Sequence, residues 1–331
     1  ASYQAPVAVN AIPESINDDG ENRPKILLGQ HNEIFISWTH KTPGRYSGDV
    51  RFARSLDGGV SFESPITVNS DKTLISHRFD ALTMDEQGHL YLTWIDKRDQ
   101  VQAKNQNQDY AGAALYYAVS KDSGASFMAN QKLVDHSCEC CRIATDTDSK
   151  GQVVAFWRQV YPESIRDHAI AYIIPGKIST RNKAMRATYD NWQIEGCPHH
   201  GPDLSIDKND IAHMAWFTQG EDQKGLMYGQ FDLAAQRIQF ATTIDNSTGA
   251  SRPQVHVIDN SVYLMWKHFN GKVMELLIRR SHDGGKTWSS NQLIATTRQG
   301  SDHPDWVNKE SQLFASWHTQ SEGFQMIPVN L

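Results

Sequence analysis

A strand-like pattern that ends in tryptophan recurs six times along this chain of 331 residues. Each copy is short, rich in β-branched and aromatic residues, and bounded by turn residues, which is typical of a β-strand. The copies end at Trp38, Trp94, Trp157, Trp216, Trp266 and Trp317, at intervals of 50 to 63 residues. Other apolar runs precede and follow each copy, which gives about four antiparallel strands per repeat. This pattern predicts an all-β fold, a six-bladed β-propeller.

The two ends of the chain indicate how such a propeller closes. The sixth repeat ends after a third strand, Gln325–Val329, and the chain begins with Ala5–Val9, which is similar to the fourth-strand segment Ser64–Val68. We therefore expect the N-terminal strand to complete the last blade, and residues 1–331 to form a single propeller domain. Two packed β-sandwiches are the alternative, but they would not explain six evenly spaced tryptophan strands.

Charge and hydropathy exclude two classes of partner. The chain has 38 acidic and 32 basic residues, a net charge of −6, and no long run of Lys or Arg, so it is not expected to bind nucleic acid. The longest stretch without charge or strong polarity, Ala111–Val119, has nine residues, whereas a membrane span needs about 18. The chain starts without an initiator Met, which favours a secreted or periplasmic protein whose signal peptide has been removed, although a trimmed chain would start the same way.

Three repeats share a further motif after their third strand. It combines Ser, Asp, Gly, a hydroxyl residue and an aromatic residue, and occupies Ser55–Phe62, Ser120–Phe127 and Ser281–Trp288. The Asp can accept backbone N–H groups of the turn, the Gly can adopt a positive φ, and the aromatic residue can anchor the turn on its blade. These segments match the Asp-box repeats of bacterial neuraminidases, and the whole chain resembles the sialidase-like six-bladed propellers. The resemblance implies that the boxes are structural and lie opposite the active face.

The resemblance also implies which loops meet at the active face, namely those before the first strand and those after the second strand of each blade. All four cysteines and eight of the fourteen histidines fall in such loops. This concentration of thiols and imidazoles indicates a site. The histidines concerned are His40, His77, His136, His199, His200, His268, His303 and His318.

Sialidase chemistry needs arginines for the substrate carboxylate, because guanidinium is a planar bidentate donor. The candidates are Arg23, Arg78, Arg142 and Arg252 for the carboxylate, with Asp80 or Asp96 as the acid/base group. The resemblance also implies a late Tyr nucleophile paired with a Glu, but Phe324 stands in that segment. In addition, Arg23-Pro24-Lys25 replaces the Arg-Ile-Pro signature of the first blade. The chain is therefore interpreted as diverged from true sialidases, and a structural role for the arginines is equally open.

A metal site is the other interpretation of the same loops, since thiolate and imidazole are ligands of zinc and copper, and thiolates favour Cu(I). The predicted ligands are Cys138, Cys140, Cys141, Cys197, His199 and His200, with His77, His136, His268 and His303 as further ligands or supporting residues. The spacing is not that of a zinc finger, so copper is preferred and zinc is the alternative. Structural disulfides or a redox-active thiol pair would also account for the cysteines.

These observations leave three functional hypotheses. The first is a sialidase-like propeller that binds copper, either as a copper-dependent redox enzyme or as a copper-handling protein. The second is an exo-acting glycoside hydrolase of the exo-α-sialidase type, which uses the arginine cluster. The third is a propeller that binds carbohydrate or protein without catalysis. The expected partner is a small-molecule substrate or a metal ion, or, for the third hypothesis, a carbohydrate or protein. Neither nucleic acid nor a membrane span is expected.

Overall fold

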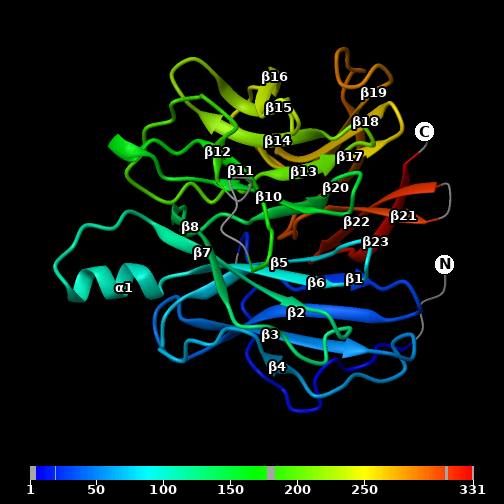
Figure 1. The fold of residues 1–331 in the computed structure, drawn as a ribbon. Coiled ribbons are helices and arrows are strands. Elements are labelled where there is room, and N and C mark those ends of the chain that lie inside the picture. Colours follow the sequence, from blue (N-terminus) through cyan, green and yellow to red (C-terminus); the bar gives the residue numbers. More distant parts are fainter. Residues whose placement is uncertain (1–4, 19, 177–182, 310–311, 330–331) are drawn as a thin grey trace. The chain divides into compact units, whose positions relative to one another are not determined.

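The computed structural model describes residues 5–18, 20–176, 183–309 and 312–329. Its strands form six antiparallel sheets, and the fold is a six-bladed β-propeller, as the repeats predict. In Figure 1 the colours run from blue in the first sheet to red in the last, because each sheet is made of consecutive strands. The chain divides into two compact units, Ala1–Ala155 with Ala171–Ala184 and Phe156–Ile170 with Met185–Leu331. The single domain over residues 1–331 stays a prediction.

Each sheet has its strands in chain order, as expected for a meander. The first sheet contains β1 (Lys25–Leu28), β2 (Ile34–Lys41), β3 (Gly48–Ser55) and β4 (Ile66–Thr67). The second contains β5 (His77–Met84), β6 (Leu90–Asp96), β7 (Ala113–Ser120) and β8 (Gln131–Ser137), with the helix α1 (Arg98–Asn105) between β6 and β7. The third contains β9 (Ala144–Thr147), β10 (Val153–Arg158), β11 (His168–Tyr172) and β12 (Met185–Arg186), with a short 3-10 helix η1 (Pro162–Ser164).

The remaining three sheets follow the same order. The fourth contains β13 (Asp203–Ile206), β14 (Ile211–Gln219), β15 (Lys224–Asp232) and β16 (Arg237–Asp245). The fifth contains β17 (Ala250–Ile258), β18 (Ser261–Phe269), β19 (Met274–Ser281) and β20 (Gln292–Thr297). The sixth contains β21 (Asp305–Lys309), β22 (Gln312–Thr319) and β23 (Gly323–Val329). Among the described residues, no helix has the length and apolarity needed to cross a bilayer.

The N-terminal closing strand is a correction to the sequence prediction. Residues 5–9 belong to no strand, and the sixth sheet has three strands in the described part of the chain. The similarity to Ser64–Val68 was a weak guide, because that segment itself pairs over only two residues, β4. In addition, Pro6 has no N–H to donate to a neighbouring strand, and Ala5–Ala8 is exposed, so that little apolar burial would support pairing there.

The six tryptophans that define the repeat lie in the second strand of each sheet, and all are almost completely buried. Each indole N–H also donates a hydrogen bond, which removes the cost of burying an unsatisfied polar group. The acceptors are Glu14 for Trp38, Asp96 for Trp94, Gln159 for Trp157, Asp190 for Trp216, Asp245 for Trp266 and the carbonyl of Asp302 for Trp317. These residues therefore pack inside the fold.

The three Asp boxes share one hydrogen-bond pattern. In the first, Ser55 donates its hydroxyl to Asp57, and Asp57 accepts both the backbone N–H and the hydroxyl of Ser61, at 2.9 and 2.6 Å. Asp122 and Asp283 accept the equivalent bonds. The hydroxyl and backbone donors lower the pKa of Asp57 to about 2. The boxes therefore act as closed turns, which agrees with a structural role.

Two of the boxes also contact the preceding sheet. Phe127 packs edge-on against Phe52 of β3, at 5.0 Å between ring centroids, and Trp288 packs likewise on Tyr228 of β15, at 4.9 Å. Gly124 lies against the ring of Phe52 and has φ +79°, so that a Cβ atom there would come within 2.5 Å of the ring. Glycine is therefore required at this position both for its backbone conformation and for close approach.

We expect Gly124→Ala to destabilise the fold by about 2–4 kcal/mol, because the added methyl group meets a buried ring and the backbone is left-handed. Gly88→Ala is the matched control, since Gly88 has φ +78° and no heavy atom within 4 Å of the added Cβ position. Urea unfolding of both variants separates backbone strain from the steric clash. Equal losses in the two variants would show that the contact with Phe52 contributes nothing.

Candidate functional site

Three of the four cysteines come together in the loop between β8 and β9. Cys138, Cys140 and Cys141 are all buried, and one ligand atom from each lies within 4.8 Å of the others. The Sγ atom of Cys138 is 3.8 Å from that of Cys140 and 3.5 Å from that of Cys141. A disulfide has an S–S distance of about 2.05 Å, so Cys138 is bonded to neither. In the described part of the chain, this is the one group of three or more Cys, His, Asp or Glu residues with such spacing.

The helix α1 holds this loop through Glu139, the residue between the first two cysteines. The carboxylate of Glu139 accepts hydrogen bonds from the Lys97 ammonium group and from the Gln100 amide, the latter at 2.7 Å. The helix is itself fixed to the second sheet, because Asp99 accepts from the hydroxyl of Tyr116 at 2.9 Å. The partly buried Glu139 side chain is thus held by α1 and its N-cap residue, between the buried residues Cys138 and Cys140.

The residue that follows the three thiols, Arg142, forms a buried ion pair. The guanidinium of Arg142 donates to the carboxylate of Glu21 at 3.0 Å, although 121 residues separate the two. The side chain of Glu21 is fully buried, and that of Arg142 is 7% exposed. The adjacent Asn22 accepts a hydrogen bond from the backbone N–H of Phe79 at 2.9 Å. The segment before β1 therefore links the cysteine loop to the start of β5.

The predicted acid/base residue Asp80 lies beside this segment but is closed off from solvent. Its carboxylate accepts from Ser37 at 2.6 Å, and the Thr39 hydroxyl lies 3.4 Å from Asp80 and 3.0 Å from Asn22. Burial raises the pKa of Asp80, although the positive charge of Lys25 opposes the shift. Such a carboxyl group is kept neutral more readily than an exposed one, but its position gives it no direct path to a substrate.

The predicted arginines of the first unit lie around the same segment. Arg78 is buried, and its guanidinium lies over the rings of Phe79 and Tyr46, at 5.0 and 5.8 Å from their centroids. Arg23 is partly buried, and its carbonyl accepts from Lys25. Arg142 and Arg78 are thus packed into the fold, which favours a structural role for both over substrate binding.

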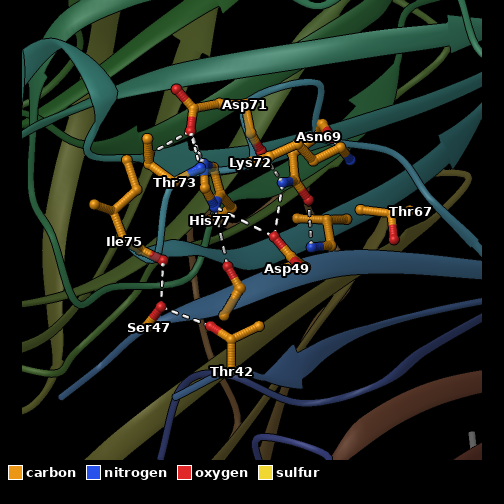
Figure 2. A network of polar contacts seen from close by, with 12 residues as sticks. Thr42, Ser47, Asp49, Thr67, Asn69, Asp71, Lys72, Thr73, Ile75 and His77 are labelled. Carbon is orange, nitrogen blue, oxygen red and sulfur yellow. Dashed lines mark hydrogen bonds and ion pairs between the residues drawn. The ribbon is translucent and has the colours of Figure 1, made fainter. Parts of the chain in front are cut away.

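His77 is fully buried in a polar network between the first two sheets, shown in Figure 2. Its Nδ1 atom lies 3.1 Å from the carbonyl of Gly48 and 3.7 Å from Asp49, while its Nε2 atom lies 3.5 Å from Asp71 and 3.9 Å from Asp96. Asn69 donates to Asp49, and Thr73 donates its backbone N–H to Asp71, so both carboxylates are held in place. His77 therefore serves this network, and a role as a ligand stays a prediction.

His136 lies at the end of β8, next to the cysteine loop, with a positive φ of 64°. Its Nδ1 atom lies 3.0 Å from the carbonyl of Ala111, and its ring packs on Tyr110 with 4.6 Å between centroids. These contacts engage one nitrogen atom of the ring and leave Nε2 as the atom that could contact a ligand. A role for His136 as a ligand or supporting residue stays a prediction.

The other predicted ligands belong to the second unit. Cys197 and His199 are exposed, and the carbonyl of His199 accepts a hydrogen bond from Arg252. His200 stacks on Phe217, with 4.2 Å between ring centroids and 23° between the planes, and its carbonyl accepts from Arg158 at 3.0 Å. The convergence of these residues with the three buried thiols stays a prediction.

Three further predicted residues also lie in the second unit. The imidazole of His268 interacts through Nδ1 with Glu275 at 2.9 Å, and His303 is buried at 6% exposure. Arg252 has a positive φ of 57°, and burial lowers its pKa to about 10. A left-handed conformation is unfavourable for a residue other than glycine, and such strain is often found at functional sites.

A buried polar cluster in the second unit was not predicted from the sequence. Asp167, His168 and Asp190 are at most 3% exposed, and they lie in the loop before β11, at the start of β11 and in the segment before β13. Asp167 pairs with Arg186, and Asp190 accepts the indole N–H of Trp216 at 2.8 Å. Asp167 follows the second strand of its sheet and Asp190 precedes the first strand of the next sheet, which are the same kinds of loop as those that hold the cysteines. Nothing in the local sequence of either aspartate indicates that it is buried.

The carboxyl group of Asp190 makes the stability of the fold depend on pH. Burial, and then the negative charge of Asp167, raise the pKa of Asp190 from 3.8 to about 6. The folded state therefore binds this proton more tightly than the unfolded state, and its stabilising effect is present below pH 4 and lost as the pH rises through about 6. We expect Asp190→Asn, whose side-chain oxygen can still accept the indole N–H of Trp216, to abolish this pH-dependent loss of stability. The loss is worth about 3 kcal/mol. Urea unfolding of both proteins between pH 4 and 7 measures the difference, and parallel curves would contradict it.

Comparison with known proteins gives structural similarity only. No family model matches this chain, and no curated protein matches it. Among solved structures, the Hadza microbial sialidase Hz136 superposes with a TM-score of 0.60 at 11% identity, over 93% of this chain and 65% of that protein. The α-L-arabinofuranosidase Arb93A from Fusarium graminearum, in complex with an iminosugar inhibitor, gives 0.61 at 12% identity, over 96% and 95% of the two chains. The α-L-arabinanase from Penicillium chrysogenum, complexed with arabinobiose, gives 0.58 at 10% identity, over 100% and 98%.

The shared feature is the propeller fold. At 10 to 12% identity the likeness establishes nothing finer, and this chain spans about two thirds of the sialidase's length. The resemblance stated from the Asp boxes is thus confirmed for the six-bladed propeller, whereas the sialidase family itself stays a prediction.

Proposed function

We propose that this protein binds a soft transition-metal ion, copper as Cu(I), through Cys138, Cys140 and Cys141. The geometry of the thiols supports the proposal. Two sulfurs that each lie about 2.3 Å from one ion are roughly 3.8–4.0 Å apart in tetrahedral or trigonal coordination. The Sγ separations of 3.8 and 3.5 Å are close to this range without any ion. Small adjustments of the side chains would therefore complete the site.

The donor set favours copper over zinc. Structural zinc sites have four protein ligands, whereas three thiolates suit Cu(I), the softer ion. Among the described residues, the group with suitable spacing consists of the three thiols alone. Zinc is the alternative, and it would require a fourth ligand. We further propose that the site serves a copper-handling or copper-dependent redox function in a secreted or periplasmic protein.

Metal analysis of the reduced protein tests the proposal. Protein purified without oxygen is titrated with Cu(I) against a coloured Cu(I) chelator, and separately with Zn²⁺. We expect one tightly bound Cu(I) per chain and weaker binding of zinc. A variant with all three clustered cysteines changed to serine is the control, and it should bind no Cu(I). A reduced wild-type protein that binds neither metal would refute the proposal.

The glycosidase hypothesis makes a separate prediction. The fold is shared with glycosidases, but the acid/base candidate Asp80 is buried and Phe324 stands in place of the expected Tyr. We therefore expect no turnover of a fluorogenic sialoside above the uncatalysed rate. Turnover that is lost in Arg252→Ala would favour an exo-acting hydrolase instead, with the arginine as a binding group. The same assay with the triple cysteine variant separates hydrolysis from any effect of the metal.

A further inference from the structure

The second unit contains a cavity of about 630 Å³ at the loops before β17 and after β18. This volume lies within the usual range of small-ligand sites, about 300–1,000 Å³. Its walls come from four separate parts of the unit. The residues that bear on its chemistry are His200, Phe217, Ser251, His268, Phe269 and Asn270.

Flat apolar surfaces form part of the wall. The ring of His200 lies almost parallel to that of Phe217, and Arg158 holds the His200 backbone through its carbonyl. The side chain of Phe269 also lines the cavity, although half of its surface is exposed. An exposed phenylalanine at the mouth of a cavity leaves an apolar face for a ligand to cover.

Polar groups stand beside these rings in fixed positions. Glu275 interacts with Nδ1 of His268 at 2.9 Å and accepts from the amide of Asn270 at 2.5 Å. The Asn270 carbonyl oxygen in turn accepts the backbone N–H groups of Lys272 and Val273, each at 3.0 Å. The carboxylate therefore selects the His268 tautomer that carries its proton on Nδ1, so that Nε2 is a hydrogen-bond acceptor.

The charge of the residues that line the cavity favours a neutral ligand over an anionic one. Neither lysine nor arginine is among the described residues that line it. Three cations adjoin the lining residues in sequence: Lys267 donates to the carbonyl of Ser301 at 2.8 Å, Arg252 donates to that of His199, and Lys272 is exposed. The nearest carboxylate, Glu275, would repel a second negative charge. An acid such as a sialic acid would find no cationic partner among the described residues that line the cavity.

We propose that this cavity binds a neutral sugar of one or two rings. The C–H face of such a ring is apolar and would cover Phe269, while its hydroxyl groups would hydrogen-bond with His268, Asn270 and Ser251. This combination of an apolar face and hydroxyl donors matches the wall better than a purely apolar molecule does, since the polar groups would otherwise lose their water without replacement. The inference is independent of the thiol cluster, and it adds a second binding site to the protein.

Calorimetric titration with four neutral disaccharides, arabinobiose, xylobiose, cellobiose and lactose, tests this inference. N-acetylneuraminic acid is the anionic comparison. We expect at least one neutral disaccharide to bind with a Kd on the order of 1 mM or tighter and the acid not to bind. Binding of the acid alone, or of none of the five compounds, would overturn the proposal.

Two variants locate the site. Phe269→Ala and Glu275→Gln are each expected to weaken binding about 3- to 10-fold, through loss of stacking and of the His268 orientation. Leu293→Ala is the matched control, because Leu293 is 53% exposed, much as Phe269 is at 50%, and lies outside the cavity. Affinity unchanged in both variants would place the sugar elsewhere and refute the inference. The Cys138→Ser protein should bind sugar like the wild type, which separates this site from the proposed metal site.

Discussion

Cys138→Ser is expected to weaken Cu(I) binding by roughly 100-fold or more. Cys138 is the thiol whose Sγ lies within 3.8 Å of both other sulfurs, so its loss leaves two donors on a short loop. A serine hydroxyl is a hard donor that Cu(I) binds poorly. Changes to residues that merely support a ligand cost about 10- to 100-fold in metal affinity, so loss of a ligand should lie at or above that range. Competition against a Cu(I) chelator measures the change.

The pH dependence of binding provides a second test of the same site. A thiol binds metal as a thiolate, and its ordinary pKa is about 8.5, so that binding releases protons at neutral pH. Affinity should therefore fall as the pH is lowered from 8 to 6, more steeply in the wild type than in Cys138→Ser. Cys197→Ser is the matched control for a cysteine outside the buried group. An unaltered affinity in Cys138→Ser would show that the copper is bound elsewhere.

Local patterns were sufficient to predict the strands and the thiol group. The alternation of side chains along a strand, together with one large aromatic residue per repeat, is a local signal of burial, and all six tryptophans obey it. Cys138, Cys140 and Cys141 lie within four residues of one another, so a single loop conformation suffices to bring their sulfur atoms together. The Asp boxes are local in the same sense, since the hydrogen bonds between their Ser, Asp and hydroxyl residues lie within five residues.

Long-range polar contacts could not be predicted in this way. Glu21 and Arg142 form a buried pair across 121 residues, and no pattern around Glu21 distinguishes it from a surface glutamate. That contact depends on the register of two sheets and also on the path of two loops. The same holds for Asp190, whose pKa is raised by burial and by Asp167 and lowered by the hydrogen bond from Trp216 of β14. The N-terminal strand failed for a related reason, because similarity of sequence does not specify a pairing partner.

Glu21→Ala is expected to destabilise the fold by about 3–5 kcal/mol. The variant removes the carboxylate 3.0 Å from Arg142 and leaves a guanidinium that is 7% exposed without this counter-charge. It also loosens the segment in which Asn22 binds Thr39 and the backbone of Phe79. Because Arg142 directly follows Cys141, the looser loop should also weaken Cu(I) binding in protein that remains folded. Urea unfolding and chelator competition on the same sample measure the two effects.

The double variant Glu21→Leu with Arg142→Met tests whether charge or packing causes the loss of stability expected in Glu21→Ala. Replacing a buried ion pair by apolar residues of similar volume is often neutral or stabilising, whereas removing one partner is costly. We therefore expect the double variant to recover at least half of the stability lost in Glu21→Ala. If its stability is as low as that of Glu21→Ala, the cost comes from the shape of the segment rather than from an uncompensated charge. If Glu21→Ala unfolds like the wild type, the ion pair does not stabilise the cysteine loop, and the thiols must be positioned from the α1 side, through Glu139 and Lys97.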